Sequence, residues 1–301
     1  MPNKSSKPVI TRRDFLKTGS YVAAGSLVGL PLLHRASAQT AAKSRVVLIR
    51  DRSAVDENGR VNGPVLESML DQAVVAMLDA PDAASAWRRL FGPDDVVGIK
   101  TNAWFRLPTP EALETALVFR LGQAGVKSGS IAVDDRGIRD NPVFMRSTAL
   151  INVRPMRTHH WSGLGTLLKN YIMFVSAPWS YHGNACERLG AIWQKPQVAG
   201  KTRLNILVML TPLFHGIGPH HFSRRYVWPY AGLIVSTDPV AADATGARII
   251  EAKRKAFFDD QRPISPPPLH IAAADTRFGL GNSNADRIEL LRLGWGEQIL
   301  I

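Results

Sequence analysis

The strongest constraint on the fold is a regular alternation of short β-branched segments with longer segments of helical period. The candidate strands are apolar runs bounded by turn residues, at residues 45–50, 96–100, 130–135, 149–153, 204–210 and 230–236. The candidate helices are residues 64–78, 110–124, 163–174, 183–194 and 239–258. Strands that alternate with helices form a mostly parallel central sheet with helices on both faces. We therefore predict an α/β fold, as a single domain over residues 39–301.

Polar and charged residues directly follow several of the candidate strands. The segments concerned are residues 100–102, 134–136, 154–160 and 237–238. Ligands of open α/β sheets bind beyond the carboxyl ends of the strands. We therefore expect the ligand site of this chain to lie at that edge of the sheet.

Several of these segments together resemble the family of domain of unknown function 362. The segments that carry the resemblance are Val-Gly-Ile-Lys-Thr-Asn at 97–102, the strand 149–153 leading to Thr158-His159, Gly163 and Thr166 followed by Leu168-Lys169-Asn170, Ile-Val-Ser-Thr-Asp-Pro-Val-Ala-Ala-Asp at 234–243, and Gly279-Leu280-Gly281. The resemblance spans most of residues 39–301 and implies no particular activity. Some relatives carry ferredoxin-type cysteine clusters. This chain has Cys186 as its single cysteine, so its own cysteines cannot hold an iron–sulfur cluster. Relatives often have an Asp after the strand equivalent to 204–208, where this chain has the apolar run 207–210.

The strongest candidate for chemistry is His159 with Lys169 and Asn170. The glycines at 163 and 165 lie between them and allow close approach of a ligand to the backbone. A histidine supplies a base or a metal ligand, and a lysine binds an anion or forms a Schiff base. We predict that the three residues are catalytic, the alternative being a polar strand end with a solvated lysine.

Lys100, Asn102 and Asp134 are the candidate cofactor-binding residues, because each comes at the end of a candidate strand. The alternative for the first two is a pair of solvated strand-end groups. The alternative for Asp134 is a salt bridge within the loop 134–136.

A second cluster places three histidines on a Gly/Pro-rich loop. His215, His220 and His221, with Asp238 from elsewhere, are the candidate ligands of a transition metal. The spacing is not a zinc signature, and loop histidines also pair with carbonyl groups or water. Asp238 precedes Pro239, so it is equally well explained as the N-cap of the helix 239–258.

Three common enzyme classes are disfavoured by their missing motifs. The sequence contains no Gly-x-Ser-x-Gly, no phosphate-binding P-loop and no Gly-x-Gly-x-x-Gly fingerprint. We expect a cofactor- or metal-dependent enzyme that acts on a small anionic molecule, its cofactor unidentified. The alternative is a non-catalytic metal or cofactor carrier, or assembly factor, that uses the loop 215–221.

The N-terminal segment has the pattern of a twin-arginine signal peptide. Arg12-Arg13 precede an apolar stretch at 21–33, and Ala36-Ser37-Ala38 follows as a small-x-small cleavage site. The stretch is too short to span a bilayer stably, so we expect no stable membrane anchor after cleavage. We predict export of the folded protein to the periplasm by the twin-arginine machinery, with cleavage after Ala38.

The net charge of +12 is partly a property of this segment. Residues 1–38 contain six basic residues and one acid, so residues 39–301 carry a net charge of +7. The remaining basic residues are scattered, without a nucleic-acid-binding motif. We therefore expect a small anionic ligand as the partner and no nucleic acid.

Overall fold

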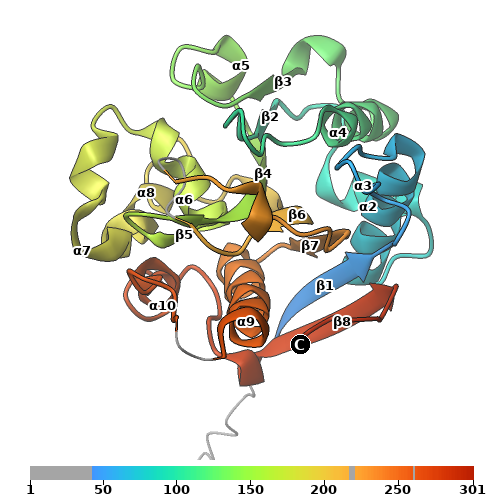
Figure 1. The fold of residues 1–301 in the computed structure, drawn as a ribbon. Helices are drawn as coiled ribbons and strands as arrows, with labels where there is room; N and C mark the ends of the chain where they lie inside the picture. The colour runs from blue at the N-terminus through green and yellow to red at the C-terminus, as the bar shows by residue number, and fades with distance from the viewer. Residues whose placement is uncertain (1–42, 217–220, 260–261) are drawn as a thin grey trace, which may run out of the picture. The chain divides into compact units, whose positions relative to one another are not determined.

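A mixed eight-stranded sheet organises the part of the chain that the structure, a computed structural model, describes: residues 43–216, 221–259 and 262–301 (Figure 1). The strands are β1 (Ser44–Arg50), β2 (Val97–Lys100), β3 (Ile131–Asp134), β4 (Ala149–His159), β5 (Gly163–Gly165), β6 (Thr202–Leu213), β7 (Gly232–Ser236) and β8 (Ile288–Gly294). The order across the sheet is β3-β2-β4-β6-β7-β1-β8, and β5 pairs with β4. This architecture confirms the predicted α/β fold with its mostly parallel sheet.

The helices of the described segments are α-helices of 4 to 20 residues and short 3-10 turns. The α-helices are α2 (Gly63–Leu78), α3 (Ala83–Leu90), α4 (Glu111–Gln123), α5 (Pro142–Met145), α6 (Leu167–Asn170), α7 (Gly183–Cys186), α8 (Gly190–Trp193), α9 (Pro239–Phe258) and α10 (Leu269–Thr276). The 3-10 turns are η1 (Ser128–Ser130), η2 (Tyr171–Phe174), η3 (Pro178–Tyr181), η4 (Glu187–Leu189), η5 (Arg224–Tyr226) and η6 (Ala285–Arg287). Within these segments, no helix combines the length and apolar character needed to cross a bilayer.

Helices cover both faces of the sheet, because side chains alternate between the faces along each strand. On β1, Val47 and Ile49 pack in the core that α2, α3 and α4 share with the sheet. Val46 and Leu48 belong instead to the core formed with α6, α8, α9 and α10. Figure 1 shows α2, α3 and α4 grouped on one side of the strands and α9 and α10 on the other. The two apolar layers fix the sheet and therefore the positions of its strand ends.

The direction of β7 corrects the prediction that all strand-end residues share one edge. β2, β3, β4 and β6 pair in parallel, but β7 is antiparallel to both β6 and β1. Ser236, at the carboxyl end of β7, is therefore opposite Asn205 near the start of β6. Asp238 consequently lies at the edge opposite the carboxyl ends of the parallel strands.

Two predicted helices are also replaced by shorter elements. Residues 163–174 form β5, α6 and η2, because Gly163 has a positive φ of 68° and β5 turns back to pair with β4. Residues 183–194 form α7, η4 and α8, since Asn184, Ala185 and Cys186 all adopt left-handed backbone angles. Residues with positive φ cannot continue a right-handed helix. By contrast, the helix 239–258 is confirmed as α9.

Candidate functional site

A cavity of about 280 Å³ opens where β2, β3 and β4 end. Because these strands are parallel, their carboxyl ends meet at the same edge of the sheet. The lining residues are Asn102, Trp104, Asp135, Arg136, Arg154, Arg157, His159, Lys169, Asn170, Ile172, Met173, Pro178 and His182. The cavity is therefore built from the strand-end segments and from residues 169–182, which follow β4 and β5 along the chain.

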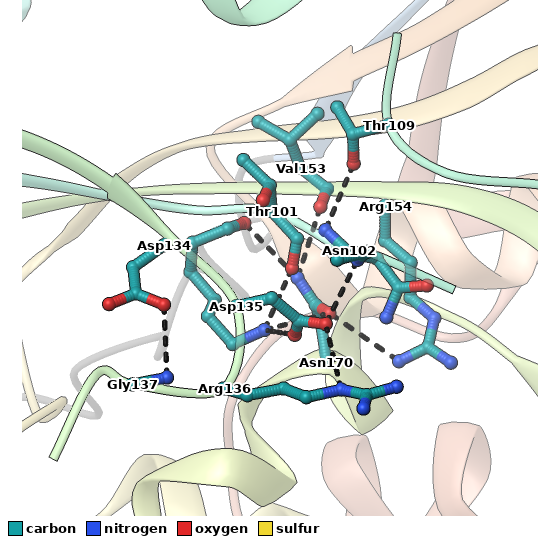
Figure 2. Close-up of polar contacts among 12 residues, drawn as sticks. Thr101, Asn102, Thr109, Asp134, Asp135, Arg136, Gly137, Val153, Arg154 and Asn170 are labelled. Atoms are coloured by element: carbon teal, nitrogen blue, oxygen red, sulfur yellow. Dashed lines mark hydrogen bonds and ion pairs between the residues drawn. The ribbon is translucent and has the colours of Figure 1, made fainter. Parts of the chain in front are cut away.

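A buried polar network around Lys100 closes one side of the cavity. The Lys100 ammonium donates to the Asp135 carboxylate at 2.5 Å, to the carbonyl of Thr101 at 2.7 Å and to Oδ1 of Asn170 at 3.3 Å. Burial lowers the pKa of Lys100 to about 8, although Asp135 opposes the shift. Figure 2 shows Asp135 and Asn170 gathered beside the end of β2. Lys100 is thus an ion-paired structural residue that does not itself line the cavity.

Asn170 connects β2 and β4 through its side-chain amide. Its Nδ2 donates to the carbonyls of Lys100 at 3.2 Å and Val153 at 3.1 Å, and to Oδ1 of Asn152 at 2.9 Å. Its Oδ1 accepts from Lys100, and from Arg154 at a longer 3.5 Å. Since both ends of the amide are engaged, Asn170 positions its neighbours in the cavity wall.

Two arginines of β4 are buried in the cavity wall, and neither forms an ion pair with a carboxylate of the described residues. Arg154 and Arg157 are 4% and 6% exposed, and the Nε atom of each has no hydrogen-bond partner among the described residues. Arg157 donates to Oδ1 of Asn102 at 2.8 Å, and its guanidinium lies 4.5 Å from the centre of the Trp104 ring. Burial lowers the pKa of Arg154 to about 10, and burial also holds the pKa of Arg157 well below its ordinary value. Both side chains therefore hold buried positive charge with donors to spare.

Lys169 is also buried but, unlike Lys100, it has no carboxylate partner among the described residues. Its side chain is almost wholly buried, and the one hydrogen-bond partner of Nζ among the described residues is the Cys186 thiol at 3.5 Å. Burial lowers the pKa of Lys169 to about 8; Cys186 opposes the shift, and Arg154 contributes to it. An amine with such a pKa is partly neutral, and therefore nucleophilic, near neutral pH.

The hydrogen bonding of His159 indicates which of its nitrogens carries the proton. Its Nδ1 accepts from the backbone N–H of Trp161 at 3.2 Å. Burial and the nearby Lys169 hold its pKa far below the ordinary value, so the ring is neutral. A neutral imidazole that accepts at Nδ1 carries its proton on Nε2. His159 therefore presents an N–H donor. This differs from the expected role as a base.

Asp243 orients the segment that carries Lys169 and Asn170. Its carboxylate oxygens accept the backbone N–H groups of Leu167 and Leu168, each at 2.9 Å. These amides open α6, so the carboxylate caps the turn whose following residues are Lys169 and Asn170. The motif at 234–243 thus acts on the site indirectly, through its last residue.

The structure brings most of the predicted catalytic and cofactor-binding residues together. His159, Lys169, Asn170 and Asn102 all line the cavity, and Lys100 lies directly behind it. Asp134 does not line it: its carboxylate accepts from the backbone N–H of Gly137 at 3.0 Å and from Asn141 at 3.2 Å. Its neighbour Asp135, the residue that follows β3, lines the cavity instead.

The predicted metal ligands do not converge in the described residues. His215 packs against Phe258 and its Nδ1 lies 3.0 Å from Nη1 of Arg254, near the end of α9. Asp238 caps the other end of this 20-residue helix, about 30 Å away at the helical rise. His221 lies beside His215 in a separate cavity, and His220 lies outside the described residues. Within those residues, no group of three or more His, Cys, Asp or Glu side chains is placed to hold a metal ion.

Asp238 has a structural role at the amino edge of the sheet. Its carboxylate accepts from the backbone N–H groups of Val240, Ala241 and Asn282 and from the hydroxyl of Ser44. These contacts join α9 to the start of β1. The N-cap interpretation of Asp238 is therefore confirmed.

Asp135, Arg154 and Arg157 were not predicted as individual site residues. The fourth strand was predicted to end at residue 153, whereas β4 continues to His159. The register between β4 and β6 is irregular between Pro155 and Arg157, and such a bulge lets side chains three residues apart reach one cavity. Two arginines flanking Pro155-Met156 after an apolar run were the available signal.

Comparison with known proteins gives one match. Residues 138–248 match the family model described as Domain of unknown function (DUF362). The matched region contains Arg154, Arg157, His159, Lys169, Asn170 and Asp243. No curated protein and no solved structure matches the chain significantly. Residues 138–248, which supply most of the charged cavity wall, are therefore the part of the chain that is similar to the DUF362 family.

Proposed function

We propose that the chain is an exported enzyme that binds a small organic anion in the cavity at the carboxyl ends of β2, β3 and β4. Lys169 is its reactive group, and Arg154 and Arg157 hold the anion. The volume of about 280 Å³ suits a small molecule. The DUF362 match names no reaction, so the proposal rests on the cavity.

The observation that carries the proposal is the charge imbalance of the wall. Arg154, Arg157 and Lys169 are buried cations that line the cavity, whereas Asp135 is the one carboxylate among its lining residues. That carboxylate already binds the Lys100 ammonium and the backbone N–H of Ala103. Buried charges are costly unless they are paired, so an anionic ligand would supply the missing partner.

The remaining polar groups suit chemistry on a bound anion. Lys169 supplies an amine that both accepts a proton and acts as a nucleophile, because its pKa is lowered to about 8 by burial. The Nε2–H of His159 supplies a neutral hydrogen-bond donor to an oxygen that gains negative charge. Burial also lowers the pKa of His182 to about 4, so this second imidazole of the wall is neutral at pH 7.

Anion binding is tested by calorimetry with a panel of small acids, including acetate, succinate, pyruvate and phosphate. Arg157→Gln should weaken the binding of the preferred acid by roughly 10- to 100-fold, the loss expected for a hydrogen bond to a charged group. Arg203→Gln is the matched control, because Arg203 pairs with Asp95 at the opposite edge of the sheet. Equal losses in both variants, or no binding by any acid, would refute the site.

Export by the twin-arginine route is a separate part of the proposal. It rests on Arg12-Arg13, the apolar stretch 21–33 and the site at Ala36-Ser37-Ala38, all outside the described residues. Changing Arg12 and Arg13 together to Lys should leave unprocessed protein in the cytoplasm, as seen by fractionation and intact mass. Unchanged processing of that variant would rule out the route.

A further inference from the structure

We propose that Lys169 forms an imine with the carbonyl carbon of a small oxo acid, so that the anion bound in the cavity carries a ketone or aldehyde close to its carboxylate. The inference rests on the proposed function, which states only that an organic anion binds. It adds the substrate class and the covalent step.

The contrast between the two buried lysines of the site supports this role for Lys169. Lys100 is held by a carboxylate, a carbonyl and an amide oxygen, so its ammonium has three acceptors. Lys169 has the Cys186 sulfur as its hydrogen-bond partner among the described residues, and a thiol is a weak acceptor. A buried lysine without a strong acceptor is poorly stabilised as an ammonium, and it lines the cavity directly.

The surroundings of Lys169 keep the amine reactive. Ile172, Met173 and Pro178 contribute apolar surface to the same cavity. Arg154 and Arg157 lie near enough to lower the pKa of the amine, beyond the larger effect of burial. Desolvation and neighbouring cations are the two means by which lysines become nucleophiles in proteins.

The arrangement also places the other groups that imine formation needs. With the carboxylate of the oxo acid on the two arginines, the adjacent carbonyl lies beside the cluster of Lys169 and His159. The Nε2–H of His159 donates to the carbonyl oxygen and makes the carbon more electrophilic. Because that nitrogen keeps its proton, His159 polarises the carbonyl and does not compete for the proton of the amine.

The step balances without any further reactant. The lone pair of the neutral Lys169 amine attacks the carbonyl carbon and gives a carbinolamine, with one amine proton moving to the former carbonyl oxygen. Loss of that hydroxyl with the second amine proton releases one molecule of water and leaves the C=N bond. No oxidant or reductant takes part, and hydrolysis returns the free lysine.

The experiment traps the imine by reduction in the full chain. The protein is incubated with pyruvate, 2-oxoglutarate or acetoacetate and with sodium cyanoborohydride, and then examined by intact mass and peptide mapping. We expect one adduct per chain, on the peptide that contains Lys169, with an added mass equal to that of the acid less one oxygen atom. Comparing the 2-oxo acids with acetoacetate tells whether the carbonyl must adjoin the carboxylate.

Matched controls distinguish this inference from the broader proposal. Lys169→Arg and Lys169→Met should abolish the adduct, whereas Lys201→Arg should retain it; lactate and succinate should bind and give none. Peptide mapping of the unaltered protein decides the point even where a variant folds poorly. If the oxo acids bind by calorimetry but leave Lys169 unmodified, the imine is refuted and the anion site stands. If no organic anion binds, both are refuted.

Discussion

The Lys100 ammonium and the Asp135 carboxylate form an ion pair of 2.5 Å in which the lysine is fully buried and the acid 8% exposed. Asp135 also accepts from the backbone N–H of Ala103, and Lys100 also donates to Asn170. The pair therefore ties the end of β2 to the residue after β3 and to α6. The net contribution of this ion pair to the free energy of unfolding is best measured by removing one partner and then both.

Asp135→Asn should destabilise the protein by about 3–5 kcal/mol, because it leaves the Lys100 charge buried without a carboxylate. The measurement is urea unfolding at pH 7. The double variant Lys100→Met/Asp135→Asn should lose less than Asp135→Asn alone, since no uncompensated charge remains. A double variant as unstable as the single one would show that the charge of Lys100 is not the cause.

Gly165→Ala should reduce the free energy of anion binding more than it reduces the free energy of unfolding. A Cβ at this position would lie 2.9 Å from Nη2 of Arg154, so the guanidinium must shift from its place in the cavity wall. Gly122→Ala in α4 is the control, because a Cβ there meets nothing within 4 Å and alanine favours the helix by up to about 1 kcal/mol. Calorimetry should show a loss of affinity for Gly165→Ala and none for Gly122→Ala.

The sequence alone predicts a large part of the fold and a part of this site. Periodicity identified six strands of the sheet and α9, and the strand-end rule located the edge that holds His159, Lys169 and Asn170. It could not show that β7 runs against its neighbours, because strand direction depends on pairing between distant segments. It also could not show the bulge in β4 that brings Arg154 and Arg157 to one cavity, since a bulge is set by the register with β6.

The role of Asp243 was likewise beyond the sequence. Asp243 follows Asp238 by five positions, but its partners, Leu167 and Leu168, are 75 or more positions away. Only the packing of α9 against α6 brings the carboxylate to those amides. Local patterns therefore gave the candidate residues, and tertiary contacts gave their roles.

The stability of the protein should fall with rising pH in a window set by Asp243. Burial raises the pKa of this carboxyl to about 7, above its ordinary value, although its hydrogen bonds oppose the shift. The native state then binds the proton more tightly than the unfolded state, so the free energy of unfolding decreases from about pH 4 to about pH 7. Asp243→Asn should remove that decrease.

Urea unfolding of both proteins at several pH values measures the effect as a difference. The unaltered protein should lose stability relative to Asp243→Asn between pH 4 and pH 7, and the difference should be constant above pH 7. Taking the difference cancels the titrations that the two proteins share. Parallel profiles across the window would contradict the raised pKa.

The affinity for an organic anion should fall as the pH rises through about 8. Below that value the Lys169 ammonium attracts the anion, and above it the amine is neutral, because burial lowers its pKa to about 8. Arg154 remains mostly charged in this range, since its own pKa is lowered only to about 10. Calorimetry from pH 6.5 to 9.5 with succinate, which has no carbonyl to react, isolates this electrostatic effect.

Lys169→Met separates this effect from the titration of Lys100, whose pKa burial also lowers to about 8. In the variant, succinate should bind more weakly at pH 6.5, and its affinity should change little up to pH 9.5, because Lys100 is compensated by Asp135 and lies behind the cavity wall. A variant that keeps the full decline would assign the titration to Lys100. A decline centred well above pH 9 in the unaltered protein would instead show that Lys169 is more solvated than its place in the wall implies.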